Sequence, residues 1–192
     1  MSVRRSSSTR LCACGASEKV EAALAAFDVR VADRVALDVG AAAGGFTLVL
    51  LRAGARRVYA VDAGHGQLLG SLRQDGRVVN LEATNLGDLE RTLVPEPVDL
   101  VTLDLSYLPL RAAVPQLERV AISAQADAIA LVKPQFELGL AQLPTGRNEL
   151  CKATRRARDA FDDAGWRVRA LIRSPVTGAR GAIEFLLHAT RT

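Results

Sequence analysis

The chain has 192 residues, of which 49% are hydrophobic and 24% are charged, and its formal net charge at pH 7 is +4. This length supports one sizeable hydrophobic core and excludes two full domains. No apolar run reaches the length of a membrane span, and the basic N-terminus lacks the apolar stretch of a secretory signal, so we expect a cytoplasmic protein with no membrane partner.

Residues 1–16 are polar and rich in serine and arginine, and we expect them to form a tail. From Ser17 onward the apolar residues follow helical spacing, which predicts a first helix with Ser17 as its N-cap. The sequence thus divides into a tail over residues 1–16 and a single domain over residues 17–192. The three cysteines are too few for a disulfide framework or a structural zinc site, so we expect free thiols and no metal.

Beyond the first helix, apolar strands alternate with amphipathic helices. Strands are predicted over residues 34–39, 56–62, 77–83, 98–106 and 126–134, and helices over residues 44–54, 66–75, 87–93 and 110–122. This rhythm indicates a parallel sheet with helices on both faces. A helix over residues 149–165 and two strands, 166–174 and 182–190, end the pattern. The short loop between the two strands predicts an antiparallel pair at one edge of an otherwise parallel α/β sheet.

The stretch LDVGAAAGGFT joins the first predicted strand to its helix. Gly40, three alanines, Gly44 and Gly45 permit a ligand to approach the backbone, and the helix N-terminus offers free N–H groups. The spacing is not that of a dinucleotide site. Asp38 would repel a pyrophosphate but suits the cationic amino-acid group of S-adenosylmethionine, and Asp62, at the end of the next strand, is placed to accept hydrogen bonds from ribose hydroxyls. The alternatives are that Asp38 only orients the turn and that Asp62 is a solvated strand end.

Charged residues also follow two later strands. Asp104 and Lys133 each lie at the carboxyl end of a predicted buried strand, which is the edge where open α/β sheets bind ligands. A structural ion pair is the alternative, although burial of a lysine and a carboxylate carries a desolvation cost that packing seldom justifies. Glu184 adds a carboxylate to an otherwise apolar strand.

Six segments together carry a family resemblance: ALDVGAAAGGFT, RRVYAVDAGHGQL, LRQDGRVVNLEATN, DLVTLDLSYLPL, ALVKPQFELG and SPVTGARGAIEFLLH. In this order, from about Lys19 to His188, they resemble the TlyA-type members of the FtsJ-like ribosomal RNA 2′-O-methyltransferases, some of which carry the name haemolysin. The resemblance implies a Rossmann-like class I methyltransferase fold, S-adenosyl-L-methionine as cofactor, and ribosomal RNA or a ribosomal subunit as partner.

The family uses a Lys-Asp-Lys-Glu tetrad for ribose methylation, and by resemblance its members here are Lys19, Asp104, Lys133 and Glu184. A ribose hydroxyl is a poor nucleophile, so Lys133 is the candidate base. An ordinary lysine is protonated at neutral pH, so desolvation or a second cation such as Lys19 must favour its neutral form. The alternative is that alignment of the reacting groups is the larger effect.

The residues expected to bind the cofactor surround the turn and the ends of the neighbouring strands. They are Asp38, Gly40, Ala41, Gly44, Gly45, Phe46, Asp62, Ala63, Asn85 and Asp104.

Three features depart from the family pattern. Family members usually begin with a small RNA-binding module, for which this chain has no room, so a partner protein is expected to take its place. The loop ACGASEK before Lys19 lacks an arginine of the family, and the loop after Lys133 is also altered. Basic residues that could follow an RNA backbone cluster in the C-terminal part, although a solvated helix face is the alternative. They are Arg147, Lys152, Arg155, Arg156, Arg158, Arg167, Arg169, Arg173 and Arg180.

Three functions therefore compete. The first is methyl transfer from S-adenosylmethionine to a ribose 2′-hydroxyl of ribosomal RNA, which the presence of all four tetrad residue types favours. The second keeps the cofactor and replaces the acceptor by a small molecule or another RNA. The third is a non-catalytic RNA-binding relative in which the tetrad has no function.

Overall fold

The computed structural model describes residues 7–192, with side chains from Gly15 onward. The helices and strands follow in the order α1 (Ser7–Phe27), β1 (Val35–Val39), α2 (Gly45–Arg52), β2 (Arg57–Asp62), α3 (Gly70–Arg73), β3 (Val78–Glu82), η1 (Leu86–Asp88), β4 (Val98–Leu103), α4 (Leu110–Ala113), η2 (Val114–Arg119), β5 (Ile122–Val132), α5 (Pro134–Leu138), α6 (Arg147–Asp163), β6 (Trp166–Arg173), η3 (Ala179–Gly181) and β7 (Phe185–Arg191), where η marks a 3₁₀ turn.

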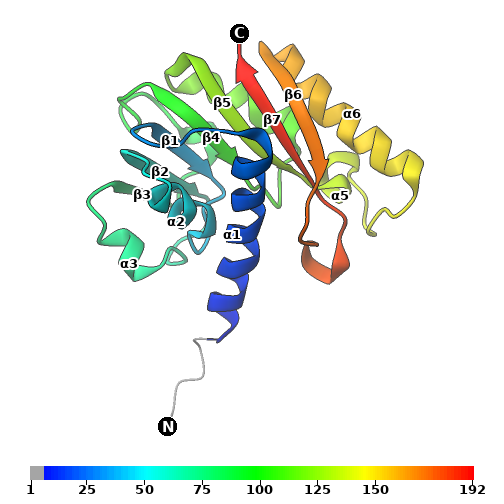
Figure 1. Cartoon of the computed structure of the whole chain (residues 1–192), viewed down its shortest axis with the longest axis horizontal. Helices are drawn as coiled ribbons and strands as arrows, with labels where there is room; N and C mark the ends of the chain where they lie inside the picture. The colour runs from blue at the N-terminus through cyan, green and yellow to red at the C-terminus, as the bar shows by residue number, and fades with distance from the viewer. Residues whose placement is uncertain (1–6) are drawn as a thin grey trace.

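The strands form one seven-stranded sheet in the order β3-β2-β1-β4-β5-β7-β6. The first five strands are parallel to one another, and β7 is antiparallel to both of its neighbours. In Figure 1, β7 points upward between β5 and β6, and β6 points downward. The predicted α/β fold with a mostly parallel sheet and an antiparallel pair near one edge is confirmed.

Successive side chains of a strand point to opposite faces of the sheet, and this gives one apolar layer on each face. Leu37 and Val39 of β1 face a core that includes Phe161 of α6, whereas Ala36 faces a second core with Leu50 of α2. Helices α1, α2 and α3 cover one face of the sheet, and α4 and α6 cover the other (Figure 1). Asp104 and Lys133, which follow β4 and β5, therefore collect at the end of a sheet that is covered on both sides.

The first helix begins earlier than its sequence pattern predicts. Helix α1 starts at Ser7, so the predicted tail is wrong from residue 7 onward, and residues 1–6 lie outside the described part. Ser17 is not an N-cap, because it lies inside the helix and donates its hydroxyl to the carbonyl oxygen of Gly45 at 3.1 Å. Leucine, arginine and alanine before Ser17 support a helix, and no proline interrupts it. The sequence pattern missed these turns because they lack a clear apolar periodicity.

Three other helices differ from the prediction. The predicted helix over residues 66–75 is reduced to α3, since glycines at 66 and 70 weaken its start. The predicted helix over residues 110–122 becomes α4 and a 3₁₀ turn, because Pro115 cannot donate the hydrogen bond that continues an α-helix. The helix expected over residues 87–93 is the 3₁₀ turn η1.

One more helix differs from the prediction. Helix α5 was not predicted; it starts at Pro134, which is preorganised for the first helical position.

Cys151 is a free, exposed thiol, whereas the side chains of Cys12 and Cys14 lie outside the described part. Among the described helices, none combines the length and the apolar character needed to cross a bilayer.

The packing of α6 on the sheet gives a direct test of this core. Phe161 is completely buried and meets the ring of Trp166 edge-on, with the ring centroids 6.1 Å apart. We expect Phe161→Ala to lower the free energy of unfolding by about 3 to 5 kcal/mol, because the site cannot collapse around the lost ring. Urea unfolding followed by fluorescence of the single tryptophan measures the change. The matched control is Asp162→Ala on the exposed side of the same turn, and an equal loss in both variants would contradict this account.

Candidate active site

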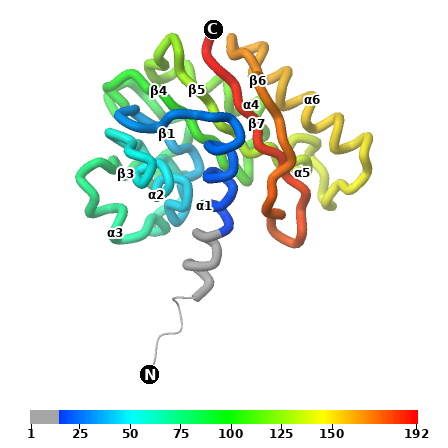
Figure 2. Tube along the Cα trace, viewed as in Figure 1, coloured from blue at the N-terminus to red at the C-terminus, as the bar shows by residue number. Residues whose placement is uncertain are grey.

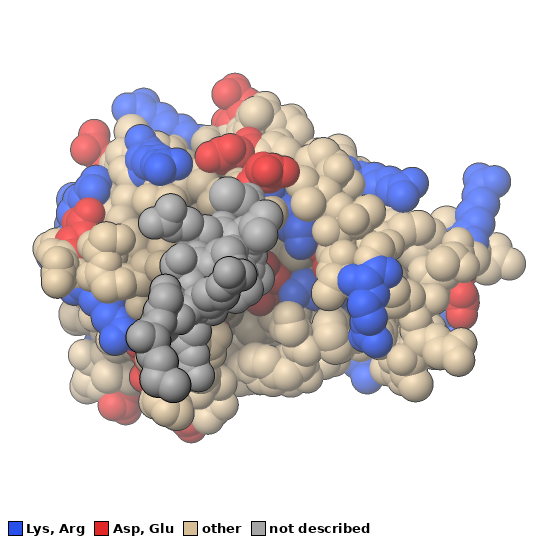
Figure 3. Space-filling model, turned by 90° about the horizontal axis from the view of Figure 1, so that it is seen from below, with Lys and Arg blue, Asp and Glu red and all other residues tan. Residues whose placement is uncertain are grey.

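A cavity of about 580 Å³ lies where β1, β4 and β5 end. Figure 3 views the molecule from this edge, where basic and acidic side chains lie next to each other in a hollow near the centre. Its walls come from α1, from the turn after β1, from the segments after β4 and β5, and from the loop between β6 and β7. The lining residues fall within 15–19, 40–46, 104–106, 133–136, 143–144 and 176–184.

All four predicted tetrad residues line this cavity. Lys19 Nζ lies 2.7 Å from Glu184 Oε2, and both side chains are buried. Lys133 Nζ lies 2.6 Å from Asp104 Oδ1 and donates a hydrogen bond to Ser106 Oγ, also at 2.6 Å. The site thus consists of two lysine–carboxylate pairs.

The sheet explains why these residues meet. Asp104 and Lys133 directly follow the adjacent parallel strands β4 and β5, whose carboxyl ends lie side by side. Strand β7 runs antiparallel to β5 and pairs Phe185 with Val132, so Glu184, which precedes β7, lies beside Lys133 in the same register. Lys19 reaches the site from α1, which packs on α2 and on β7.

The small-residue turn (residues 40–45) forms one wall of the cavity. At two of its positions, however, glycine is required by contacts within the protein and not by a ligand. Gly40 has φ +86°, and a Cβ there would lie 2.4 Å from the carbonyl oxygen of Asp104. Gly44 has φ +92°, and its added Cβ would lie 2.2 Å from Leu72 Cδ1. Gly40 lines the cavity, whereas Gly44 faces α3. A larger residue at either position would displace these neighbouring protein atoms.

Asp38 lies beneath the turn and not in the cavity. It is completely buried, and its two carboxylate oxygens accept hydrogen bonds from Thr47 at 2.6 Å and Thr102 at 2.8 Å. Burial raises the pKa of Asp38 to about 6, although the two hydroxyl donors oppose the shift. In this structure the carboxylate ties the end of β1 to α2 and β4, and the expected contact between Asp38 and a cationic ligand stays a prediction.

The remaining expected cofactor residues divide into two groups. Gly40, Ala41, Gly45, Phe46 and Asp104 line the cavity, whereas Gly44, Asp62, Ala63 and Asn85 do not. Asp62 accepts hydrogen bonds from the backbone N–H of Ala42 at 2.9 Å and of Gly64 at 2.7 Å, so it braces the turn from β2. Asn85 Nδ2 donates to Asp88 Oδ2 at 3.0 Å. Among the described residues, no group of three or more metal-binding side chains is placed to hold an ion.

Sequence reasoning missed one residue that lines the cavity, Ser106, and one that follows a lining segment, Glu137. Ser106 accepts the hydrogen bond from Lys133, and its place two residues after Asp104 is the signal that could have identified it. Glu137 is buried, and its Oε1 accepts a hydrogen bond from the N–H of Leu110 at 2.8 Å. Burial raises the pKa of Glu137. This contact joins α5, after Lys133, to the start of α4, and no local pattern predicts it because its partner is a backbone group in another segment.

Comparison with known proteins agrees with this geometry. Residues 13–191 match the model of the FtsJ-like methyltransferase family. The chain belongs to this family. It is 42% identical over 180 residues to the 16S/23S rRNA (cytidine-2′-O)-methyltransferase TlyA of Mycobacterium tuberculosis, a match that covers 89% of this chain and 65% of that protein. It is 34% identical over 179 residues to Hemolysin A of Brachyspira hyodysenteriae, with 90% of this chain and 74% of that protein covered.

Solved structures of a hemolysin-named protein and of a methyltransferase share the fold. A hemolysin-named protein of Lactococcus lactis superposes with a TM-score of 0.86 and 30% identity, covering 92% of this chain and 86% of that chain. The magnesium protoporphyrin IX methyltransferase of Synechocystis with bound SAH gives a TM-score of 0.64 at 20% identity, covering 93% of this chain and 84% of that chain. The fold is therefore that of the Rossmann-like methyltransferases. The chain spans 65% of the length of the TlyA relative.

The raised pKa of Asp38 predicts a pH dependence of stability. Folding raises this pKa from 3.8 to about 6, so the folded state holds the proton more tightly than the unfolded chain does. The resulting stability is fully present below about pH 4 and is lost as the pH rises through about 6. We expect the unfolding free energy, relative to Asp38→Asn, to fall by about 3 kcal/mol across this range. Denaturant titrations at several pH values measure it, and parallel pH profiles for the two proteins would refute the assignment.

The Lys19–Glu184 pair predicts a strong coupling between two distant segments. Lys19→Met leaves the carboxylate of Glu184 buried without its counter-charge, so we expect a loss of about 3 kcal/mol in the free energy of unfolding. Glu184→Gln alone leaves the lysine unpaired and lowers stability as well. The double variant removes both charges and recovers most of the loss. Thermal and urea unfolding of the four proteins give the coupling energy, and additive effects of the two substitutions would show that the pair is not coupled.

Proposed function

We propose that this protein transfers a methyl group from S-adenosylmethionine to a ribose 2′-hydroxyl of ribosomal RNA in the cytoplasm. The observation that carries the proposal is that both lysine–carboxylate pairs line one cavity together with the small-residue turn. The names of the TlyA relatives, which specify cytidine-2′-O-methylation of rRNA, support the same acceptor.

The residues around the turn fit the proposed cofactor. Ala41 and Gly45 line the cavity with little side chain, so a ligand can approach the backbone. The first turn of α2 has N–H groups that the helix itself leaves without partners, and these suit the carboxylate of an amino-acid group. Asp62 uses its two oxygens for backbone N–H groups, and each oxygen retains a lone pair for a ribose hydroxyl. When bound, S-adenosylmethionine supplies a methyl group on a positively charged sulfur.

In the proposed reaction, the uncharged form of the Lys133 amine accepts the proton that the ribose 2′-oxygen loses as it bonds to the methyl carbon, and the bond from that carbon to the donor sulfur breaks. Asp104 and Ser106 hold the Lys133 amine in a fixed direction through contacts of 2.6 Å each. Lys19 and Glu184 line another wall of the cavity. Their ion pair fixes the Lys19 amine, a hydrogen-bond donor, beside the proposed position of the ribose. Apolar side chains such as Phe136 line the outer part of the cavity and limit the access of water.

The choice of lysine at these positions supports proton exchange. Only three of the 25 lysine and arginine residues are lysines, at positions 19, 133 and 152, and the first two line the cavity. Arginine remains protonated in proteins and cannot act as a base, whereas a lysine amine can release its proton. Arginine provides most of the positive charge of this chain. The two lysines in the cavity therefore support a need for an amine that can exchange a proton at this site.

The proposal also includes a partner protein that adds affinity for RNA. Aromatic residues make up 4% of the chain, so few side chains can stack on RNA bases. Such a partner would act on the affinity for RNA and leave the chemistry of the tetrad unchanged.

The decisive experiment measures methyl transfer from labelled S-adenosylmethionine to ribosomal subunits and to naked ribosomal RNA. We expect Lys133→Ala to reduce the rate by at least about 100-fold, the usual size of a lost general base. Lys133→Arg keeps the charge but cannot accept a proton, so it should be equally impaired, whereas alignment alone would leave it partly active.

The matched control is Lys152→Arg, which changes the remaining lysine on an exposed turn of α6 and should keep full activity. Mapping the labelled nucleotide identifies the acceptor. If the wild-type protein binds S-adenosylmethionine but labels no RNA, the ribosomal acceptor is wrong. Labelling of a small molecule in place of RNA would then support the alternative acceptor.

A further inference from the structure

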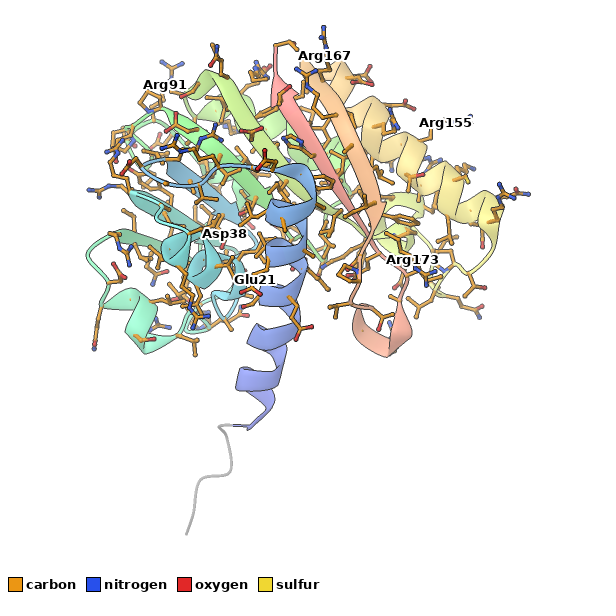
Figure 4. All side chains as sticks on the ribbon, viewed as in Figure 1. Glu21, Asp38, Arg91, Arg155, Arg167 and Arg173 are labelled. Atoms are coloured by element: carbon orange, nitrogen blue, oxygen red, sulfur yellow. The ribbon has the colours of Figure 1, made fainter. Side chains whose placement is uncertain are left out.

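A second hollow, the α6 groove, lies between the first half of α6 and the strands β6 and β7. Its volume is about 400 Å³. Helix α6 contributes Arg147, Leu150 and Thr154, strand β6 contributes Leu171 and Arg173, and the loop before β7 contributes Ile183. Figure 4 shows Arg173 at the lower end of β6, the same end of the sheet as the cavity.

The groove continues the cavity. Ile183 lines both hollows, and the next residue in the chain is Glu184 of the tetrad. Figure 2 shows the loop between β6 and β7, on which Ile183 lies, hanging below the sheet beside α5. An extended ligand that places one unit at the tetrad can therefore pass over Ile183 into the groove without crossing a helix.

The groove combines positive charge with an apolar floor. Arg147 and Arg173 are exposed on opposite sides, and Arg180 lines the neighbouring cavity. Within residues 15–192, none of these three guanidinium groups forms an ion pair. Among the side chains that the structure describes, none of those lining the groove is acidic. Leucine, isoleucine and phenylalanine form its floor, which suits the faces of ribose and base, while the arginines suit phosphate.

The other basic residues of the C-terminal part do not share this position. Arg156 donates to the carbonyl oxygen of Glu137 at 3.0 Å, and Arg169 donates to Thr190 Oγ1 at 2.9 Å. Figure 4 shows Arg167 at the upper end of the sheet, opposite to Arg173, and Arg155 farther up α6. The sequence pattern predicts one cluster of basic residues in the C-terminal part. In the structure, Arg147 and Arg173 lie at the groove and the others lie elsewhere.

We propose that the α6 groove binds the single-stranded RNA that flanks the target nucleotide, with backbone phosphates on Arg147 and Arg173. This inference rests on the proposed function, because the tetrad defines where the target ribose lies. The strand enters past Arg180, crosses Ile183 and continues between α6 and β6. The recognition is of backbone charge and sugar faces, so it is independent of base sequence.

The test compares Arg147→Gln/Arg173→Gln with the matched pair Arg91→Gln/Arg167→Gln, which removes the same charge in the upper part of Figure 4, away from the groove. The probe is a fluorescent single-stranded oligoribonucleotide of mixed sequence, titrated at several salt concentrations. Each lost phosphate contact on single-stranded RNA reduces the slope of log K against log salt by about 0.7, so the groove variant should lose about 1.4. The control pair should keep the wild-type slope.

Two further measurements separate the possible failures. Binding of S-adenosylmethionine and the melting temperature must match the wild type, which excludes a folding defect. The KM for RNA in the methyl-transfer assay should rise with the groove variant and not with the control. Equal slopes and affinities for the two double variants would overturn the groove proposal even if the wild type methylates RNA. If the wild type methylates no RNA, the proposed function fails, and the oligonucleotide titration still decides whether the groove binds RNA.

Discussion

The ion pair between Lys19 and Glu184 joins two segments that are 165 positions apart, and the candidate active site depends on it. One partner lies on α1, and the other precedes β7, so both elements must pack on the same end of the sheet before the cavity has its walls. Buried charges of this kind are tolerated only as pairs, because an unpaired ammonium or carboxylate would bear the full desolvation penalty. The chemistry of the site and the closure of the fold therefore rest on the same contact.

The turn after β1 is coupled to the tetrad in a similar way. The backbone carbonyl of Asp104 fills the space where Gly40 lacks a side chain, while the Asp104 carboxylate pairs with Lys133. Asp62 holds the same turn by accepting a hydrogen bond from the N–H of Ala42, and Asp38 joins the strand before the turn to Thr47 in the helix after it. The position of the turn is therefore tied to the position of Asp104 in the tetrad.

The sequence predicted the features that depend on local pattern and on strand ends. Asp104 and Lys133 could be assigned to one site because parallel strands end at one edge of the sheet, whereas Lys19 and Glu184 were assigned by the resemblance to the family. Contacts that depend on tertiary packing could not be predicted. Asp38 faces two threonines, and Glu137 faces a backbone N–H in another segment. The start of α1 was missed because its first turns show no apolar periodicity.

The position of β7 also bears on how the protein is made. This strand follows β6 in the chain, yet it lies between β5 and β6 and supplies both of their hydrogen-bonding partners at that end of the sheet. During translation β6 leaves the ribosome first, but it has no edge to join until β7 emerges and takes its place against β5. The nascent chain therefore carries an incomplete sheet and an unpaired Lys19 until Glu184 and β7 have emerged, and the cavity has all of its walls only after that insertion.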